Sequence, residues 1–192
     1  MNAERSDEAL MLAYRDGDAQ AFERLYRRHR GGIYRYLLRQ CRNPADAEEL
    51  FQDIWMNLIR ARARYEPRAR FTTYLYQLAH NRLIDHFRRR RPSDPGPEPA
   101  GEAEPPSWER LPAAEADGPE RRAASARQAQ RLLAALMSLP AEQRAAFLLR
   151  EEAGLSLAEI AEATGVNAET AKSRLRYAVQ KLRRALGASP DE

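Results

Sequence analysis

The sequence predicts an all-α protein in which two small helical domains are joined by a flexible, acidic, proline-rich linker. Three observations support this. Apolar residues recur at helical spacing through the first 91 residues. Eight of the twelve prolines lie between Pro92 and Pro119, and a helix-turn-helix pattern follows from Leu155 to Tyr177. A chain of 192 residues is long enough for one or two domains of this kind.

Caps and apolar stripes predict the first two helices. A short amphipathic helix is expected from Asp7 to Arg15, with an apolar face of Ala9, Leu10, Leu12 and Ala13. Asp18 can cap a longer helix that follows. The buried stripe of that helix is expected to hold Phe22, Leu25, Tyr26, Ile33, Tyr34, Leu37 and Leu38.

Asn43 and Pro44 predict a third helix, because Asn is a good N-cap and Pro is favoured at the first helical position. Its inner face is expected to hold Ala47, Leu50, Phe51, Ile54 and Leu58. An acidic stripe, Asp46, Glu49 and Asp53, lies on its outer side. This domain is otherwise basic, so the stripe is not expected to face DNA. From the residues alone, it faces either a basic protein partner or water.

A basic segment containing Tyr65 precedes the fourth helix, which is expected to begin near Phe71. The inward residues of this helix are Leu75, Ala79, Leu83 and Phe87, and it ends in four arginines, Arg88 to Arg91. Arginines beside aromatic rings suit single-stranded DNA, where cations hold phosphates and rings stack on bases. In the alternative, the rings are core and the arginines only solubilise the protein. Core is favoured for Phe71, whereas Tyr65 and Tyr74 stay open.

Charge divides the chain in the same way as its prolines. Residues 1–91 carry about +7, residues 92–124 about −5 and residues 125–192 about +2. The acidic segment has few apolar residues to offset its ordering entropy, so we expect a flexible tether. It could instead imitate nucleic acid and occupy a basic channel of a partner.

The C-terminal pattern carries the signals of a helix-turn-helix. Ser156 and Glu159 have the spacing of a capping box, Gly165 suits the turn, and Asn167 suits an N-cap. The second helix has an inner face of Ala171, Leu175, Ala178 and Leu182, and an outer face of Glu169, Lys172, Ser173 and Arg176. Such a face suits a major groove, although charged outer faces are often only solvated.

Other residue types exclude several kinds of site. Cys41 is the single cysteine and cannot form an internal disulfide, and a buried helical role is the better interpretation. The three histidines, His29, His80 and His86, lack metal-binding spacing, so no metal is expected. The N-terminus lacks the apolar core of a signal peptide, and no run is long enough to span a membrane. We therefore expect a cytoplasmic protein.

The motifs of both domains together resemble a known family. The N-terminal motifs are D-A-E-x-L-x-Q-D at Asp46–Asp53, F-x-x-Y-L at Phe71–Leu75 and L-A-x-N at Leu78–Asn81. The C-terminal motifs are Leu139-Pro140, FLLR at Phe147–Arg150, GLS at Gly154–Ser156, EIA at Glu159–Ala161 and T-x-K-S-R at Thr170–Arg174. Their order and spacing resemble those of an extracytoplasmic-function (ECF, group IV) RNA polymerase sigma factor.

The resemblance implies a sigma region 2 over residues 8–91, a linker over residues 92–124 and a sigma region 4 over residues 125–188. It implies binding to core polymerase through Asp46, Glu49, Gln52 and Asp53. It implies capture of the unpaired −10 strand by Arg64, Tyr65, Arg68, Arg70, Tyr74, Asn81 and Arg88. It implies reading of the −35 duplex by Asn167, Glu169, Thr170, Lys172, Ser173, Arg174 and Arg176. The partners implied are bacterial core RNA polymerase, promoter DNA and an anti-sigma factor, possibly membrane-associated, with no small-molecule substrate and no cofactor.

Four positions depart from the family pattern. Tyr74 stands where the family usually has Trp, Tyr177 and Val179 stand where it commonly has Arg, and Ala171 replaces a typical Val.

Two other functions were also considered. A stand-alone helix-turn-helix regulator would need a dimer interface and a palindromic site. An enzyme would need clustered carboxylates or a nucleophile beside a base, and neither is evident, so no enzymatic activity is expected.

Overall fold

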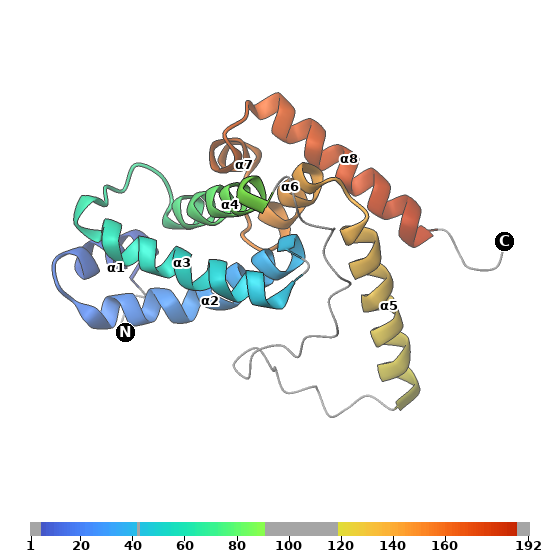
Figure 1. Ribbon diagram of the computed structural model, residues 1–192, viewed down its shortest axis with the longest axis horizontal. Coiled ribbons are helices and arrows are strands. Elements are labelled where there is room, and N and C mark those ends of the chain that lie inside the picture. Colours follow the sequence, from blue (N-terminus) through green and yellow to red (C-terminus); the bar gives the residue numbers. More distant parts are fainter. Residues whose placement is uncertain (1–4, 42, 91–118, 188–192) are drawn as a thin grey trace.

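The computed structural model describes residues 5–41, 43–90 and 119–187, and every regular element within them is helical (Figure 1). The all-α prediction is confirmed. An N-terminal bundle comprises α1 (Asp7–Arg15), α2 (Ala19–Cys41), α3 (Pro44–Ala61), the 3₁₀ turn η1 (Arg62–Arg64) and α4 (Phe71–Arg90). Within it, α2 packs against α1, α3 and α4, and α3 also packs against α4.

A C-terminal domain comprises α5 (Pro119–Met137), α6 (Ala141–Glu151), α7 (Leu157–Thr164) and α8 (Ala168–Gly187). The other three helices pack against α8. Helix α5 begins at Pro119, inside the segment that the sequence assigned to the linker. The rest of that acidic segment, residues 92–118, lies outside the described residues.

The local cap signals are confirmed. Asn43 accepts a hydrogen bond from Ala45 N at 2.9 Å at the start of α3, and Asp18 accepts from Ala21 N at 3.2 Å at the start of α2. Ser156 and Glu159 form a full capping box, and Gly165 has the left-handed φ of +66° that its turn needs. These signals are local, so the neighbouring residues alone specify them.

The core contains most of the predicted apolar residues, but the buried face of α1 differs from the prediction and some other positions are exposed or only partly buried. In α1 the buried residues are Leu10, Met11 and Tyr14, whereas Ala9 is exposed. Phe87 was predicted to pack inward and is 39% exposed, because it lies in the last turns of α4 where the bundle ends. Other predicted core positions, Phe22, Tyr26, Leu38 and Leu175, are only partly buried.

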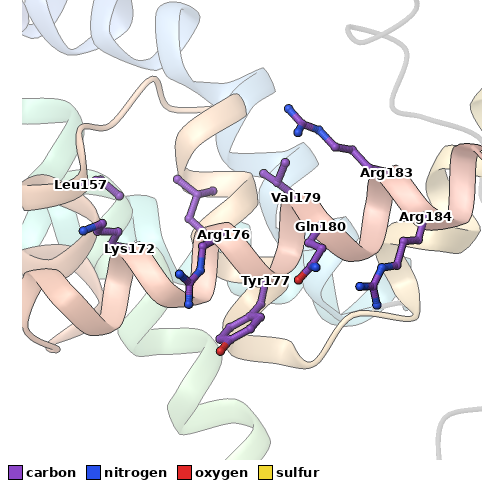
Figure 2. Close-up of a pocket in the computed structure, with 9 residues that line it drawn as sticks. Leu157, Lys172, Arg176, Tyr177, Val179, Gln180, Arg183 and Arg184 are labelled. Carbon is purple, nitrogen blue, oxygen red and sulfur yellow. The ribbon is translucent and has the colours of Figure 1, made fainter.

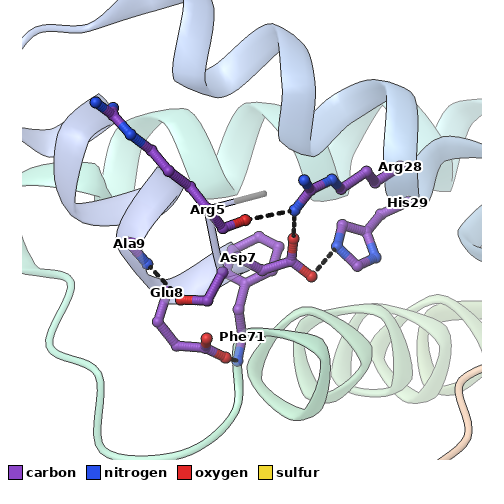
Figure 3. Close-up of polar contacts among 8 residues, drawn as sticks. Arg5, Asp7, Glu8, Ala9, Arg28, His29 and Phe71 are labelled. Atoms are coloured by element: carbon purple, nitrogen blue, oxygen red, sulfur yellow. Dashed lines mark hydrogen bonds and ion pairs between the residues drawn. The ribbon is translucent and has the colours of Figure 1, made fainter. Parts of the chain in front are cut away.

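Within the bundle, helix α1 makes polar contacts with both α2 and the start of α4 (Figure 3). Asp7 pairs with Arg28 of α2 at 2.7 Å and with His29 at 2.8 Å, and Glu8 accepts a hydrogen bond from Phe71 N at 2.7 Å. Burial alone raises the pKa of Glu8, but the hydrogen bonds from Phe71 N–H and Ser6 outweigh it and hold that pKa below its usual value. Glu8 therefore caps the N-terminus of α4 from α1, a helix far away in the sequence, and fixes where the basic loop before α4 ends.

The two domains pack against each other. Helix α7 packs against α4, and α6 packs against α2 (Figure 1). Glu152, directly after α6, pairs with Arg35 Nε at 2.9 Å and also with Arg39, both on α2. The C-terminal domain therefore covers part of α2 and part of α4.

Candidate nucleic-acid interface

A basic, aromatic groove lies beside the start of α4. Its volume is about 420 Å³, and the residues that line it include Arg64, Tyr65, Arg68 and Tyr74. The sequence singled out these four residues, and the structure brings them together. Glu162 of α7 lines the same groove, so the C-terminal domain forms part of its wall.

The two tyrosines of the groove differ in exposure. Tyr65 is only 4% exposed, and its ring packs against Phe71 and Tyr74 with centroids 6.3 and 5.5 Å away. Its buried phenol oxygen has no hydrogen-bond partner among the described residues. Burial, together with the nearby carboxylate of Glu8, raises the pKa of Tyr65 to about 12. Tyr65 is therefore a core ring in this arrangement, whereas Tyr74 is half-buried and reaches the groove.

The remaining residues assigned to the −10 strand lie on exposed surfaces. Arg70 is at the end of the loop, and Asn81 and Arg88 lie farther along α4. Tyr74, Asn81 and Arg88 are spaced by seven residues, which places them on one face of the helix. Arg68 pairs with Glu66 at 2.6 Å and Arg88 with Asp85 at 3.0 Å. Exposed pairs of this kind are weak, so they leave both cations able to contact phosphate.

Helix α8, the second helix of the helix-turn-helix, begins at a cap, with Asn167 accepting a hydrogen bond from Thr170 N at 2.8 Å. Glu169, Lys172 and Arg176 are exposed, whereas Thr170 and Ser173 are half-buried. Arg174 is also half-buried, and it lies close enough to His80 of α4 for its positive charge to lower the pKa of His80. In this arrangement, the outer face of α8 thus has an exposed side, with Lys172 and Arg176, and a side near the N-terminal bundle, with Arg174.

A shallow apolar hollow continues along the open side of α8 (Figure 2). It is lined by residues of α7 and α8, namely Leu157, Lys172, Leu175, Arg176, Tyr177, Val179, Gln180, Arg183 and Arg184. Tyr177 is 47% exposed, and the guanidinium carbon of Arg176 lies 5.1 Å from its ring centroid. This contact holds the Arg176 side chain beside the ring.

The acidic stripe of α3 is partly used within the bundle. Asp53 pairs with Arg82 of α4, and Asp46 lies 3.6 Å from the ring of His86. Glu49 and Gln52 are exposed.

The described residues contain no group of three or more His, Cys, Asp or Glu side chains that could hold a metal ion. No described helix is long and apolar enough to cross a membrane.

The sequence did not indicate three residues that join the domains. Thr73 of α4 contacts the C-terminal domain, and Arg144 and Glu152 contact the N-terminal bundle. Their partners are 86 to 117 residues away along the chain. No local pattern marks such contacts.

A groove suited to a single strand and a helix-turn-helix suited to a duplex define a two-part DNA-binding protein. Comparisons with known proteins agree with this class. The family model for sigma-70 region 2 matches residues 25–92, and that for sigma-70 region 4 matches residues 129–182. RNA polymerase sigma factor CarQ of Myxococcus xanthus is 34% identical over 92% of this chain and 95% of its own.

Other relatives and solved structures agree. The ECF RNA polymerase sigma factor SigM of Mycobacterium tuberculosis is 32% identical over 96% of this chain and 86% of its own. The fold resembles CnrH, solved with the cytosolic domain of CnrY, at a TM-score of 0.68 and 20% identity over 96% of this chain and 99% of that one. It also resembles RpoE of Bartonella quintana, solved with the anti-sigma factor NepR, at a TM-score of 0.69 and 20% identity over 89% of this chain and 99% of that one.

The chain belongs to the ECF RNA polymerase sigma factors. It is a sigma factor that directs RNA polymerase to promoters.

Proposed function

We propose that residues 8–91 act as region 2 and capture the unpaired −10 strand, and that residues 125–188 act as region 4 and read the −35 duplex. Residues 92–124 would link the two. The observation that carries this proposal is the presence, in one sigma factor, of an arginine and tyrosine groove on α4 and an exposed basic face on α8. The chain would perform no covalent chemistry and would act in the cytoplasm.

For the −35 element, the exposed residues Glu169, Lys172 and Arg176 are the best placed to reach base edges. Arg and Lys donate to guanine, and Glu accepts from cytosine. Asn167 and Thr170 lie at the N-terminus of α8, where backbone and side-chain donors suit a phosphate. Tyr177 replaces a cation, so contact with phosphate would weaken toward the end of the helix.

For the −10 element, Tyr74 and the arginines around it would hold bases that have left the stack. Aromatic stacking contributes about 1–3 kcal/mol per base, which offsets a similar cost of unstacking. Arg64, Arg68 and Arg70 would hold the strand by its phosphates. Because polymerase would hold the two readers at a fixed separation, two weak contacts would reinforce each other.

For the polymerase, the exposed Glu49 and Gln52 are the best candidates among the four residues assigned by resemblance. Asp46 and Asp53 would support them by orienting α3 on α4 through His86 and Arg82. An anti-sigma factor is a further proposed partner, because the solved relative from Bartonella quintana is bound to one.

The test is to add the purified chain to bacterial core polymerase and to sequence the transcripts initiated from a genomic library. Starts that share two upstream motifs at a fixed spacing support the proposal. Lys172→Ala should weaken initiation and relax the −35 preference at one base position, while Arg127→Ala, at an exposed cation on α5, serves as the control. The proposal would be overturned if no starts appeared and the chain bound duplex DNA without polymerase.

A further inference from the structure

Helix α7 covers part of the face of α4 that carries the proposed −10 residues. Arg70, Thr73, Tyr74 and Gln77 follow one another at helical spacing at the start of α4. Helix α7 packs directly on α4, and its Glu162 lines the groove that Tyr74 and Gln77 also line. Thr73 is fully buried in this arrangement, so a strand in the groove cannot reach its hydroxyl while α7 packs on α4.

Glu159 of α7 makes the central polar contact of this interface. Its Oε1 accepts a hydrogen bond from Thr73 Oγ1 at 3.0 Å and lies 3.5 Å from Arg70 Nη1. Its Oε2 accepts from the backbone N–H of Ser156 at 2.8 Å. One carboxylate therefore closes the capping box of the helix-turn-helix and also binds the first turn of α4.

The environment keeps Glu159 charged. The hydrogen bond from Ser156 N–H outweighs the effect of burial, and with the contacts to Thr73 and Arg70 it holds the pKa of Glu159 below its usual value. The Glu159 side chain is 18% exposed, and Thr73 is fully buried beneath α7. Thr73 is thus a buried polar residue, and its hydroxyl donates a hydrogen bond to the Glu159 carboxylate.

The donors that contact Glu159 are of the kinds that proteins use to bind a phosphate of DNA. Proteins hold backbone phosphates with arginine guanidinium groups and with serine or threonine hydroxyls. A carboxylate presents the same negative charge and the same acceptor oxygens to these donors. The Glu159 carboxylate thus contacts two donors, Arg70 and Thr73, of the kinds that bind phosphates in other proteins.

We propose that Arg70 and Thr73 form a binding position for a phosphate of the −10 strand, and that Glu159 occupies this position in the free chain as an intramolecular substitute. This inference rests on the proposed role of α4 as the −10 reader, and it adds Thr73 to the residues that hold the strand. It also makes DNA binding and domain packing competing events, because the phosphate must displace Glu159.

The other contacts between the domains explain how a single carboxylate can compete with DNA. Glu152 pairs with Arg35 and Arg39, and Arg144 donates to Gln40, so the C-terminal domain is held beside the bundle at separate points. Glu159 is therefore held near α4 while these contacts persist, and its effective concentration there is high. The hydrogen bond to Ser156 lies within the C-terminal domain, so the capping box survives when the domains part.

The test uses the full chain with Glu159→Gln. Glutamine at this position keeps the capping box, so the variant removes the charge without removing the cap. Glu151→Gln is the matched control, because Glu151 is an exposed acid of the same domain. Domain separation is followed by energy transfer between dyes on Met56→Cys and Lys181→Cys in a Cys41→Ala background, since both label positions are exposed. Strand affinity is measured by anisotropy with a labelled pool of random single-stranded oligonucleotides.

We expect Glu159→Gln to lower energy transfer and to raise affinity for the pool by about five- to tenfold, as removal of one charged competitor allows. Glu151→Gln should match the parent in both measurements. Adding Thr73→Val to Glu159→Gln should reverse the gain in affinity while energy transfer stays low. Arg70 is not varied alone, because its loss would affect both states.

Three results would overturn the proposal. In the first, Glu159→Gln behaves as Glu151→Gln does, while the parent still initiates at promoters with two motifs, so that only this inference fails. In the second, Glu159→Gln separates the domains but Thr73→Val leaves affinity unchanged, which removes the phosphate position. In the third, no variant binds the pool and no promoter-specific starts appear, so that the proposed function fails as well.

Discussion

Arg144 of α6 binds the C-terminal end of α2 through Gln40. Its Nε donates to the side-chain oxygen of Gln40 at 3.2 Å, and its Nη2 donates to the Gln40 backbone carbonyl at 3.4 Å. Both residues are buried, and Nη1 of Arg144 also reaches the carbonyls of Met137 and Leu139. A cation from one domain therefore caps a helix of the other and also fixes the turn between α5 and α6.

Replacing Arg144 by Met should lower the free energy of unfolding by about 2–4 kcal/mol, because several buried acceptors would lose their donor. Arg127→Met, at an exposed position of α5, should change it by less than about 0.5 kcal/mol. Urea denaturation followed by circular dichroism measures both values. Equal stability of the two variants would contradict the assigned role of Arg144.

Glu152 and Glu151 form a natural matched pair. Glu152 binds Arg35 and Arg39 of the other domain, whereas its neighbour Glu151 is exposed. Because both arginines are partly solvated, Glu152→Gln should cost only about 1–2 kcal/mol, and Glu151→Gln should be close to neutral. Calorimetry should also show a less cooperative transition for Glu152→Gln. An unchanged transition would mean that this ion pair does not couple the domains.

Glu8 should contribute both to the free energy of unfolding and to the order of the loop before α4. Glu8→Ala removes the acceptor for Phe71 N and should cost about 1–2 kcal/mol, as the loss of an N-cap does. It should also increase amide exchange in the loop from Arg64 to Arg70. Glu23→Ala, at an exposed position of α2, is the control. If exchange in the loop stayed at the parental rate, the loop would not depend on this cap.

His80 should make stability depend on pH. Burial, with a further contribution from the charge of Arg174, lowers the pKa of His80 to about 4 from an ordinary value of 6.5. The groups that face it are the hydroxyl of Tyr36 on α2, 3.1 Å from its Nδ1, and Arg174 on α8. The folded state therefore favours neutral His80, while the unfolded state takes up a proton as the pH falls below 6.5.

The contribution of His80 to stability is thus complete above about pH 6.5 and is lost progressively between about pH 6.5 and 4, with a slope of at most about 1.4 kcal/mol per pH unit. His80→Gln should flatten the stability profile in this window. Urea titrations of both proteins at several pH values measure the difference. Parallel profiles would show that His80 titrates alike in the folded and unfolded states.

Caps and apolar spacing made most of this fold predictable. The start of α3 at Asn43-Pro44 and the capping box of Ser156 and Glu159 depend on adjacent residues, so the sequence alone indicates them. Phe87 was assigned to the wrong environment, because helical periodicity does not say where a bundle ends. Trp55, which is buried against Phe22 and Tyr26, was not assigned to the core in advance.

The site was predictable in composition but not in arrangement. The arginines and Tyr74 of the groove could be identified from the sequence, because they lie within a few residues of one another. The contact of Glu159 with Thr73 could not, because it joins residues 86 positions apart and depends on how two domains pack. Capping and domain contact also use the same side chain, and the sequence pattern indicated only the cap.

The most direct test of the account is the spacing between the two promoter elements, once mapped starts supply a promoter. Inserting five base pairs between them moves one element by about half a helical turn, so the two domains could not bind both elements on one polymerase. We predict that initiation falls to background, and that the parental spacing with either element mutated alone gives intermediate loss. Initiation that is unaffected by the insertion would contradict the claim that one chain reads both elements together.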